Sequence, residues 1–139
     1  MTHLRLVRFK KIFDKSADLF RTVALPKRVE DFIGGELRFP ALPVGRPYML
    51  SNAVVSSDGI MTIGDLGPSI VSGNHPNDHF LMALLRSLSD VLSSGETLRK
   101  EPHQIWTSEF ILSLQGIDSE WGDLFAEIRT NKQPPKSIF

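Results

Sequence analysis

Two polar stretches hold the residues whose types and spacing best suit ligand binding. The first, "SNAVVSSDG", places Asn52, Ser56 and Asp58 along and after an apolar run. The second, "SSGETLRKE", is a glycine turn that leads into a helix start at Thr97. Free backbone N–H groups and the positive dipole end of a helix start suit a phosphate. An Asp-Gly hairpin turn and an ordinary N-cap explain the same residues and are common in proteins, so the ligand-site signal is weak on pattern alone and both interpretations stay open.

The remaining polar residues indicate no metal site and no nucleophile. His75 and His79 are four apart, as in metal-binding pairs, but Pro76 lies between them and no third ligand is placed nearby. The serines lack the G-x-S-x-G elbow, and there is no Walker loop or G-x-G-x-x-G motif after a strand. We therefore expect no bound metal, and the pattern assigns no catalytic residue.

Composition narrows the class of protein. The 139 residues suffice for one domain with a core, and sixteen basic residues balance sixteen acidic ones, so nothing favours a nucleic-acid partner. With no cysteine there is no disulfide or thiolate chemistry. No apolar run approaches the roughly 20 residues of a membrane span, and the basic N-terminus lacks the features of a signal peptide. We expect a cytoplasmic protein that binds neither nucleic acid nor membrane.

The first 45 residues are predicted to be a helix followed by a connector. Over residues 4–20, apolar side chains recur every three or four positions, which predicts an amphipathic N-terminal helix packed on the domain or on a second subunit. A basic helix lying on a membrane surface is the weaker alternative. Residues 24–45 are rich in proline and glycine, with at most a short helix near "RVEDFI". The predicted division is therefore 1–45 and 46–139.

Strands and helices are predicted to alternate after residue 45. Strands are expected at Tyr48–Val55, Ser69–Val71 and "DVLSS", at the start of "HQIWTSEFI", and near the C-terminus. Helices are expected over "NDHFLMALLRSLSD", with Asn77 as N-cap, over a turn in "GETLRKEP", and over "DSEWGDLFAEIRTN". The buried stripes are predicted to be Phe80, Leu81, Leu84, Leu85 and Leu88 in the first helix and Trp121, Leu124, Phe125 and Ile128 in the last. This alternation predicts an α/β fold with a mostly parallel sheet.

Several motifs in order resemble the pyrimidine reductase family of riboflavin biosynthesis, the C-terminal domain of bacterial bifunctional deaminase-reductases. They are "SNAVVSSDG", "SIVSG", "LLRSLSDVL" and "SGETLRKEP", flanked by "GGELRFP", "EPHQIWTSEFI" and "FAEIRTNKQPP". The resemblance covers most of the chain and implies a dihydrofolate-reductase-like fold. It also implies reduction of a ribosylamino-pyrimidine phosphate by NADPH, in which hydride passes to the sugar carbon and the cofactor carries the chemistry.

The resemblance also implies roles for individual residues. NADPH would contact Val54, Ile70, Thr97 and Glu101. The nucleotide-like substrate would contact Asn52, Ser56, Asp58, Ser69 and Arg86, with the Arg86 guanidinium facing its phosphate. From the residues alone, Arg86 is equally a surface residue of an amphipathic helix, Thr97 an N-cap and Glu101 a solvated side chain. Ser56 and Asp58 equally form a simple turn.

The sequence departs from the family in three places. Ser57 stands where the family prefers an apolar residue, Glu101 replaces an aspartate, and "DVLSSGET" is one residue short. The sequence also ends where family members begin their next strand, so the loop for the NADPH phosphates is missing. We therefore expect a fragment, a truncated gene product or half of a split protein, acting as a dimer or with a second chain that supplies the missing half. The alternatives are a partial domain that acts by association, or a reductase of a pterin-like substrate.

Overall fold

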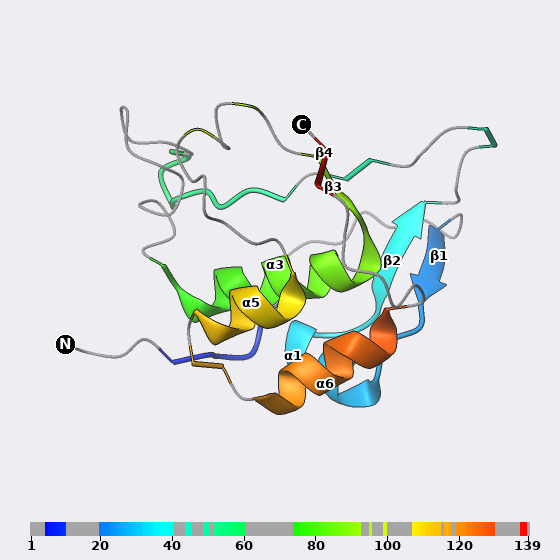
Figure 1. Ribbon diagram of the computed structural model, residues 1–139, viewed down its shortest axis with the longest axis horizontal. Helices are drawn as coiled ribbons and strands as arrows, with labels where there is room; N and C mark the ends of the chain where they lie inside the picture. Colours follow the sequence, from blue (N-terminus) through cyan, green and yellow to red (C-terminus); the bar gives the residue numbers. More distant parts are fainter. Residues whose placement is uncertain are drawn as a thin grey trace. The chain divides into compact units, whose positions relative to one another are not determined.

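The computed structural model describes residues 5–10, 20–40, 44–45, 49–50, 52–60, 74–92, 95, 99, 107–114, 116–117, 119–129 and 137–138. In chain order the elements are β1 (Phe20–Val23), α1 (Lys27–Ile33), β2 (Leu37–Pro40), α3 (Pro76–Leu88), β3 (Val91–Leu92), α5 (Ser108–Ser113), α6 (Ser119–Ile128) and β4 (Ser137–Ile138) (Figure 1). The chain divides into two compact units, residues 7–52 and residues 1–6 with 53–139. Each unit is described by itself.

The unit of residues 7–52 consists of an antiparallel strand pair whose connection holds a short helix. β1 pairs with β2 in a register that runs from Phe20 opposite Pro40 to Val23 opposite Leu37. Between them, α1 is a short helix at "RVEDFI", the one place in the connector where the sequence allowed a helix, and it buries Val29 completely. The helix ends at Gly34, which has φ +86° and donates its N–H to the Glu30 carbonyl. Glycine suits this left-handed C-terminal cap because it has no Cβ to clash.

The predicted N-terminal helix is wrong over residues 5–10, which are not helical. The Phe9 N–H donates to the Phe32 carbonyl at 2.9 Å, and the two rings meet edge to face with centroids 6.0 Å apart. Phe9 thus contacts the end of α1 through both its backbone and its ring. Because its N–H donates to Phe32, it is not available for a hydrogen bond within an N-terminal helix. Residues 11–19 lie outside the described part, and Phe20 belongs to β1.

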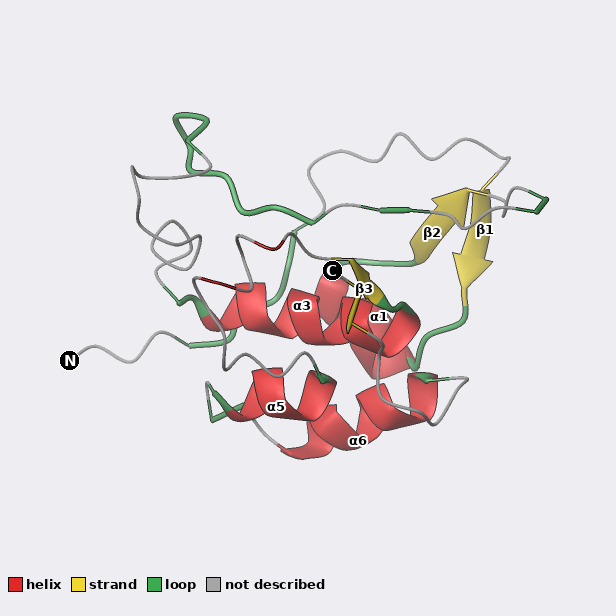
Figure 2. Cartoon of the chain, turned by 45° about the horizontal axis from the view of Figure 1, so that its top comes forward, coloured by secondary structure: helices red, strands yellow, loops and turns green. Residues whose placement is uncertain are grey.

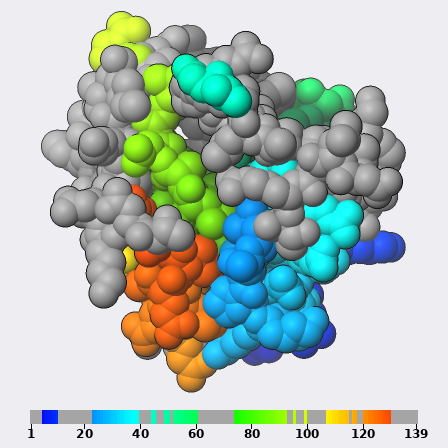
Figure 3. Space-filling model, turned by 90° about the vertical axis from the view of Figure 1, so that its right-hand side faces the viewer, coloured from blue at the N-terminus to red at the C-terminus, as the bar shows by residue number. Residues whose placement is uncertain are grey.

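The second unit is built on three helices, α3, α5 and α6, which contact one another (Figure 2). Its core is an aromatic cluster in which Phe80 of α3 lies against Trp121 and Phe125 of α6, with ring centroids 4.9 and 5.1 Å away. Figure 3 shows α6, in orange, directly beside α3, in green. Because aromatic rings bury large areas and favour edge-to-face contact, this cluster holds α3 and α6 together.

The helical predictions for α3 and α6 are largely confirmed, with shifts in detail. Phe80, Leu84 and Leu85 of α3 and Trp121 and Phe125 of α6 are buried as expected. The other predicted stripe residues, Leu81, Leu88, Leu124 and Ile128, are partly exposed, whereas Ala83 and Ser87 are buried. The N-cap of α3 is His75 instead of Asn77, because Pro76 occupies the first helical position, where its missing N–H costs nothing.

Helix α5 was not predicted. The expected strand-like start of "HQIWTSEFI" and the strand Ser69–Val71 lie outside the described residues. From Ser108 to Ser113 the chain is helical, and Thr107 is its N-cap, with Oγ1 accepting from the Phe110 N–H at 3.3 Å. The hydroxyl of Thr107 is a recognisable helix-start signal in the sequence, but the six residues that follow it are too few to show a helical period.

The expected dihydrofolate-reductase-like, mostly parallel sheet flanked by helices is wrong. Within the described part of the chain, strands form two separate pairs: β1 with β2, and β3 with β4, which run parallel with Val91 opposite Ser137. Residues 49–50 and 52–55, expected to form the first sheet strand, are not in a strand. Met49 and Val55 expose 69% and 51% of their surface, so this apolar run is not enclosed between helices as a central parallel strand would be.

Candidate functional site

The segment Ser56–Ile60 forms a closed polar turn, which confirms the turn predicted from "SSDG". The Gly59 N–H donates to the Ser56 carbonyl at 2.9 Å, and the Ser56 N–H donates to the Ile60 carbonyl at 3.0 Å. The Ser56 hydroxyl accepts from the Ile60 N–H at 2.9 Å and lies in hydrogen-bond contact with the Asp58 carboxylate. Gly59 has φ +87°, a conformation for which glycine is the natural residue.

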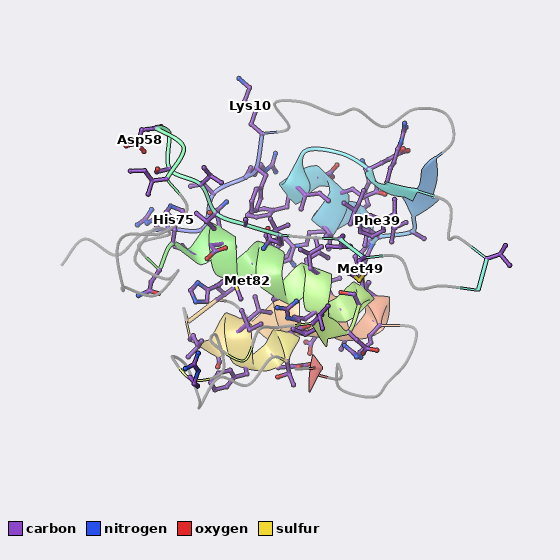
Figure 4. All side chains as sticks on the ribbon, turned by 90° about the horizontal axis from the view of Figure 1, so that it is seen from above. Lys10, Phe39, Met49, Asp58, His75 and Met82 are labelled. Atoms are coloured by element: carbon purple, nitrogen blue, oxygen red, sulfur yellow. The ribbon has the colours of Figure 1, made fainter. Side chains whose placement is uncertain are left out.

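Asp58 is the electrostatic centre of this turn. The hydrogen bond from the Ser56 hydroxyl, followed by backbone hydrogen bonds, lowers the pKa of Asp58 below its ordinary value. Asp58 is exposed on the turn, as Figure 4 shows. An ionised carboxylate accepts hydrogen bonds and repels phosphate. The turn therefore suits the hydroxyl or amino groups of a ligand and not its phosphate.

We expect Ser56→Ala to raise the pKa of Asp58 toward the ordinary carboxyl value of about 3.9, because it removes the principal hydrogen bond to the ionised form. An NMR titration of the Asp58 carboxyl carbon measures this. Since the folded-state pKa is lowered, the interaction stabilises the turn above the ordinary carboxyl pKa, and this stabilisation is lost as the pH falls through the lowered value. Ser57→Ala, at the exposed neighbouring serine, is the control; an equal shift in both variants would contradict the assignment.

Arg86 lies in the last turn of α3, where it is partly buried. Burial lowers the pKa of its guanidinium from the ordinary arginine value. Its backbone carbonyl accepts a hydrogen bond from Arg129 Nη1 at 2.6 Å, which ties the segment after α6 to the end of α3. A cation next to the free carbonyls of a helix end is favourable. Arg129 therefore fixes the backbone that carries Arg86.

Among the predicted site residues that the structure describes, Ser56 and Asp58 contact each other directly. Val54, just before the turn, is partly buried, and Asn52 is exposed and belongs to the other compact unit. Arg86 lies on α3. Ser69, Ile70, Thr97 and Glu101 lie outside the described residues. Gly95 and Arg99, on either side of Thr97, are helical, whereas Gly95 was expected to form a turn before a helix start at Thr97.

Three polar features of the helical unit were missed from the sequence. They are the His75 cap of α3, the hydrogen bond from Arg129 to the Arg86 carbonyl, and a buried contact between the hydroxyls of Ser87 and Ser108 at 2.9 Å. The sequence contains a signal for the first alone, because Pro76 at a helix start points to the residue before it as the cap. The other two join residues 43 and 21 positions apart.

The described residues contain no cluster of three or more metal-ligating side chains. None of the helices in the described part is long and apolar enough to cross a membrane. Comparisons with protein-family models, curated proteins and solved structures found no match to this chain.

Proposed function

We propose that this chain is an NADPH-dependent reductase of a ribosylamino-pyrimidine phosphate, of the type used in riboflavin biosynthesis. The observation that carries the proposal is the order of "SNAVVSSDG", "SIVSG", "LLRSLSDVL" and "SGETLRKEP" along one short chain. Each motif is common by itself, but their succession in this order along one chain is more specific than any single motif. In this proposal Thr97 contacts the cofactor and Arg86 the phosphate of the substrate.

Two local conformations support these roles. The Ser56–Asp58 turn presents an exposed carboxylate, which suits the hydroxyl and amino groups of a ribosylamino-pyrimidine. Arg86 is partly buried in the last turn of α3, and a guanidinium in partly desolvated surroundings binds a phosphate more strongly than one in water. The two groups have complementary preferences, one for the base and sugar and the other for the phosphate.

We expect the chain to bind NADPH at micromolar concentration and Thr97→Val to weaken that binding roughly tenfold or more, because valine keeps the shape but removes a hydroxyl donor to a charged group. Calorimetric titration measures the affinity. Ser57→Ala removes an exposed hydroxyl to which the proposal assigns no contact and serves as the matched control. Circular dichroism of each variant establishes that the helices remain folded.

Substrate class is tested with the same samples. The assigned substrate is supported if the chain consumes NADPH with a ribosylamino-pyrimidine phosphate and if Arg86→Lys slows this reaction by raising KM. Lysine keeps the positive charge of arginine but loses its bidentate hydrogen-bonding geometry. Turnover of dihydrofolate in its place would assign a pterin-like substrate. Absence of binding at millimolar NADPH overturns the reductase proposal for this chain. Concentration-dependent mass in light scattering, without NADPH binding, would instead support a domain that acts by association.

A further inference from the structure

Two histidines hold the start of α3. His75 Nδ1 accepts a hydrogen bond from the Asn77 N–H at 3.2 Å, and His79 Nδ1 lies 3.4 Å from the His75 carbonyl. The same carbonyl accepts from the Asp78 N–H at 3.0 Å. Figure 4 shows His75 at the beginning of this helix. The usual N-caps are serine, threonine, aspartate and asparagine, none of which changes charge near neutral pH.

These contacts assign different protonation sites to the two rings. A ring nitrogen that accepts a hydrogen bond carries no proton, so neutral His75 has its proton on Nε2. A carbonyl oxygen only accepts, so His79 has a proton on Nδ1 when it makes its contact. His79 can keep this contact when it is positively charged, whereas His75 cannot keep its own. The cap therefore depends on the neutral form of one histidine.

We infer that the N-cap of α3 depends on the protonation state of His75. When His75 becomes protonated, the cap hydrogen bond is lost and the first turn of α3 opens. An imidazolium donates from both nitrogens, so its Nδ1–H would face the Asn77 N–H. Its positive charge would also lie at the positive end of the helix dipole. The cap hydrogen bond therefore forms with neutral His75 and is lost when Nδ1 takes up a proton.

The charged groups around the cap do not replace it. Asp78 lies in the same turn and His79 one turn on, and the helices that contact α3 carry Glu109 on α5 and Glu120, Asp123 and Glu127 on α6. Among the described residues, none of these carboxylates forms an ion pair with His75. The opening stops at Phe80, which is fully buried against Trp121. The response is thus confined to the first turn.

Hydrogen exchange tests whether the N-cap of α3 depends on the protonation of His75. In the wild-type protein, protection of the Asn77 amide relative to the core amide of Leu84 should fall roughly fivefold between about pH 7.5 and about pH 5.5, the size of an ordinary cap. In His75→Asn the cap does not titrate, so the protection ratio should stay constant. His79→Gln, which keeps His75, should retain the wild-type response.

A second measurement does not depend on any variant. Long-range nitrogen–proton NMR at neutral pH should show His75 protonated on Nε2 and His79 on Nδ1. The inference is overturned if His75 carries its proton on Nδ1, if the wild-type ratio does not change with pH, or if His75→Asn responds as the wild type does. None of these outcomes depends on whether the chain binds NADPH.

Discussion

Replacement of Phe80 by alanine should lower the free energy of unfolding by about 3–5 kcal/mol, the usual range for a phenylalanine removed from a packed core. The Phe80 side chain is completely buried and lies edge to face against both Trp121 and Phe125. Its removal leaves a cavity between α3 and α6 and removes the ring contacts as well as the buried area. Urea denaturation followed by tryptophan fluorescence measures the loss, because Trp121 reports on the same contact.

A matched control comes from the same unit. Leu92 of β3 exposes 65% of its surface, so Leu92→Ala should change the free energy of unfolding by no more than about 0.5 kcal/mol. If Phe80→Ala and Leu92→Ala were equally mild, the aromatic cluster would not be the core of this unit. A decrease of about 3–5 kcal/mol is most of the free energy of unfolding of a small, marginally stable domain. We therefore expect Phe80→Ala to be largely unfolded at physiological temperature.

The second large effect is expected at the α3–α5 contact, where Ser87 and Ser108 are both 4% exposed. Their hydroxyl oxygens lie 2.9 Å apart, and the Ala83 carbonyl is 3.1 Å from Ser87 Oγ and 2.9 Å from Ser108 Oγ. Two hydroxyls have two protons, so the three contacts hold two hydrogen bonds at a time. Either both hydroxyls donate to the carbonyl, or one donates to the other, which in turn donates to the carbonyl.

We expect Ser108→Val to lower the free energy of unfolding by about 2–4 kcal/mol. Loss of the hydroxyl removes one hydrogen bond, about 1 kcal/mol, and the added methyl groups overpack a close helix contact at about 1–3 kcal/mol. Chemical denaturation measures the change.

Ser108→Ala separates the two causes. It should cost about 1 kcal/mol, because Ser87 then donates directly to the Ala83 carbonyl and no buried group is left unpaired. The double variant Ser87→Ala/Ser108→Ala should lower the free energy of unfolding by less than the sum of the single changes. Removing the remaining hydroxyl also removes the free-energy cost of burying that hydroxyl away from water. Equal losses in Ser108→Val and Ser108→Ala would contradict close packing at this contact.

The candidate site was predicted from the sequence to the extent that it is local. The Asp-Gly signal correctly placed a turn at Ser56–Ile60, because a turn depends on a few consecutive residues and on the positive φ of Gly59. The strand expected before it is absent at residues 49–50 and 52–55. A strand requires N–H and C=O partners from elsewhere in the chain, and a run of apolar residues does not specify them.

The sequence by itself determined the helices α3 and α6, because each closes its backbone hydrogen bonds within its own segment and shows its buried face as a period of three and four. It also indicated the strand near the C-terminus. Tertiary structure decided which strands pair and which residue Phe9 contacts. It also decided that Ala83 and Ser87 are buried in place of Leu81 and Leu88. These outcomes depend on contacts between residues far apart in the chain. Side-chain volume and the available partners determine which of these contacts form, and the spacing of residues along one segment does not predict them.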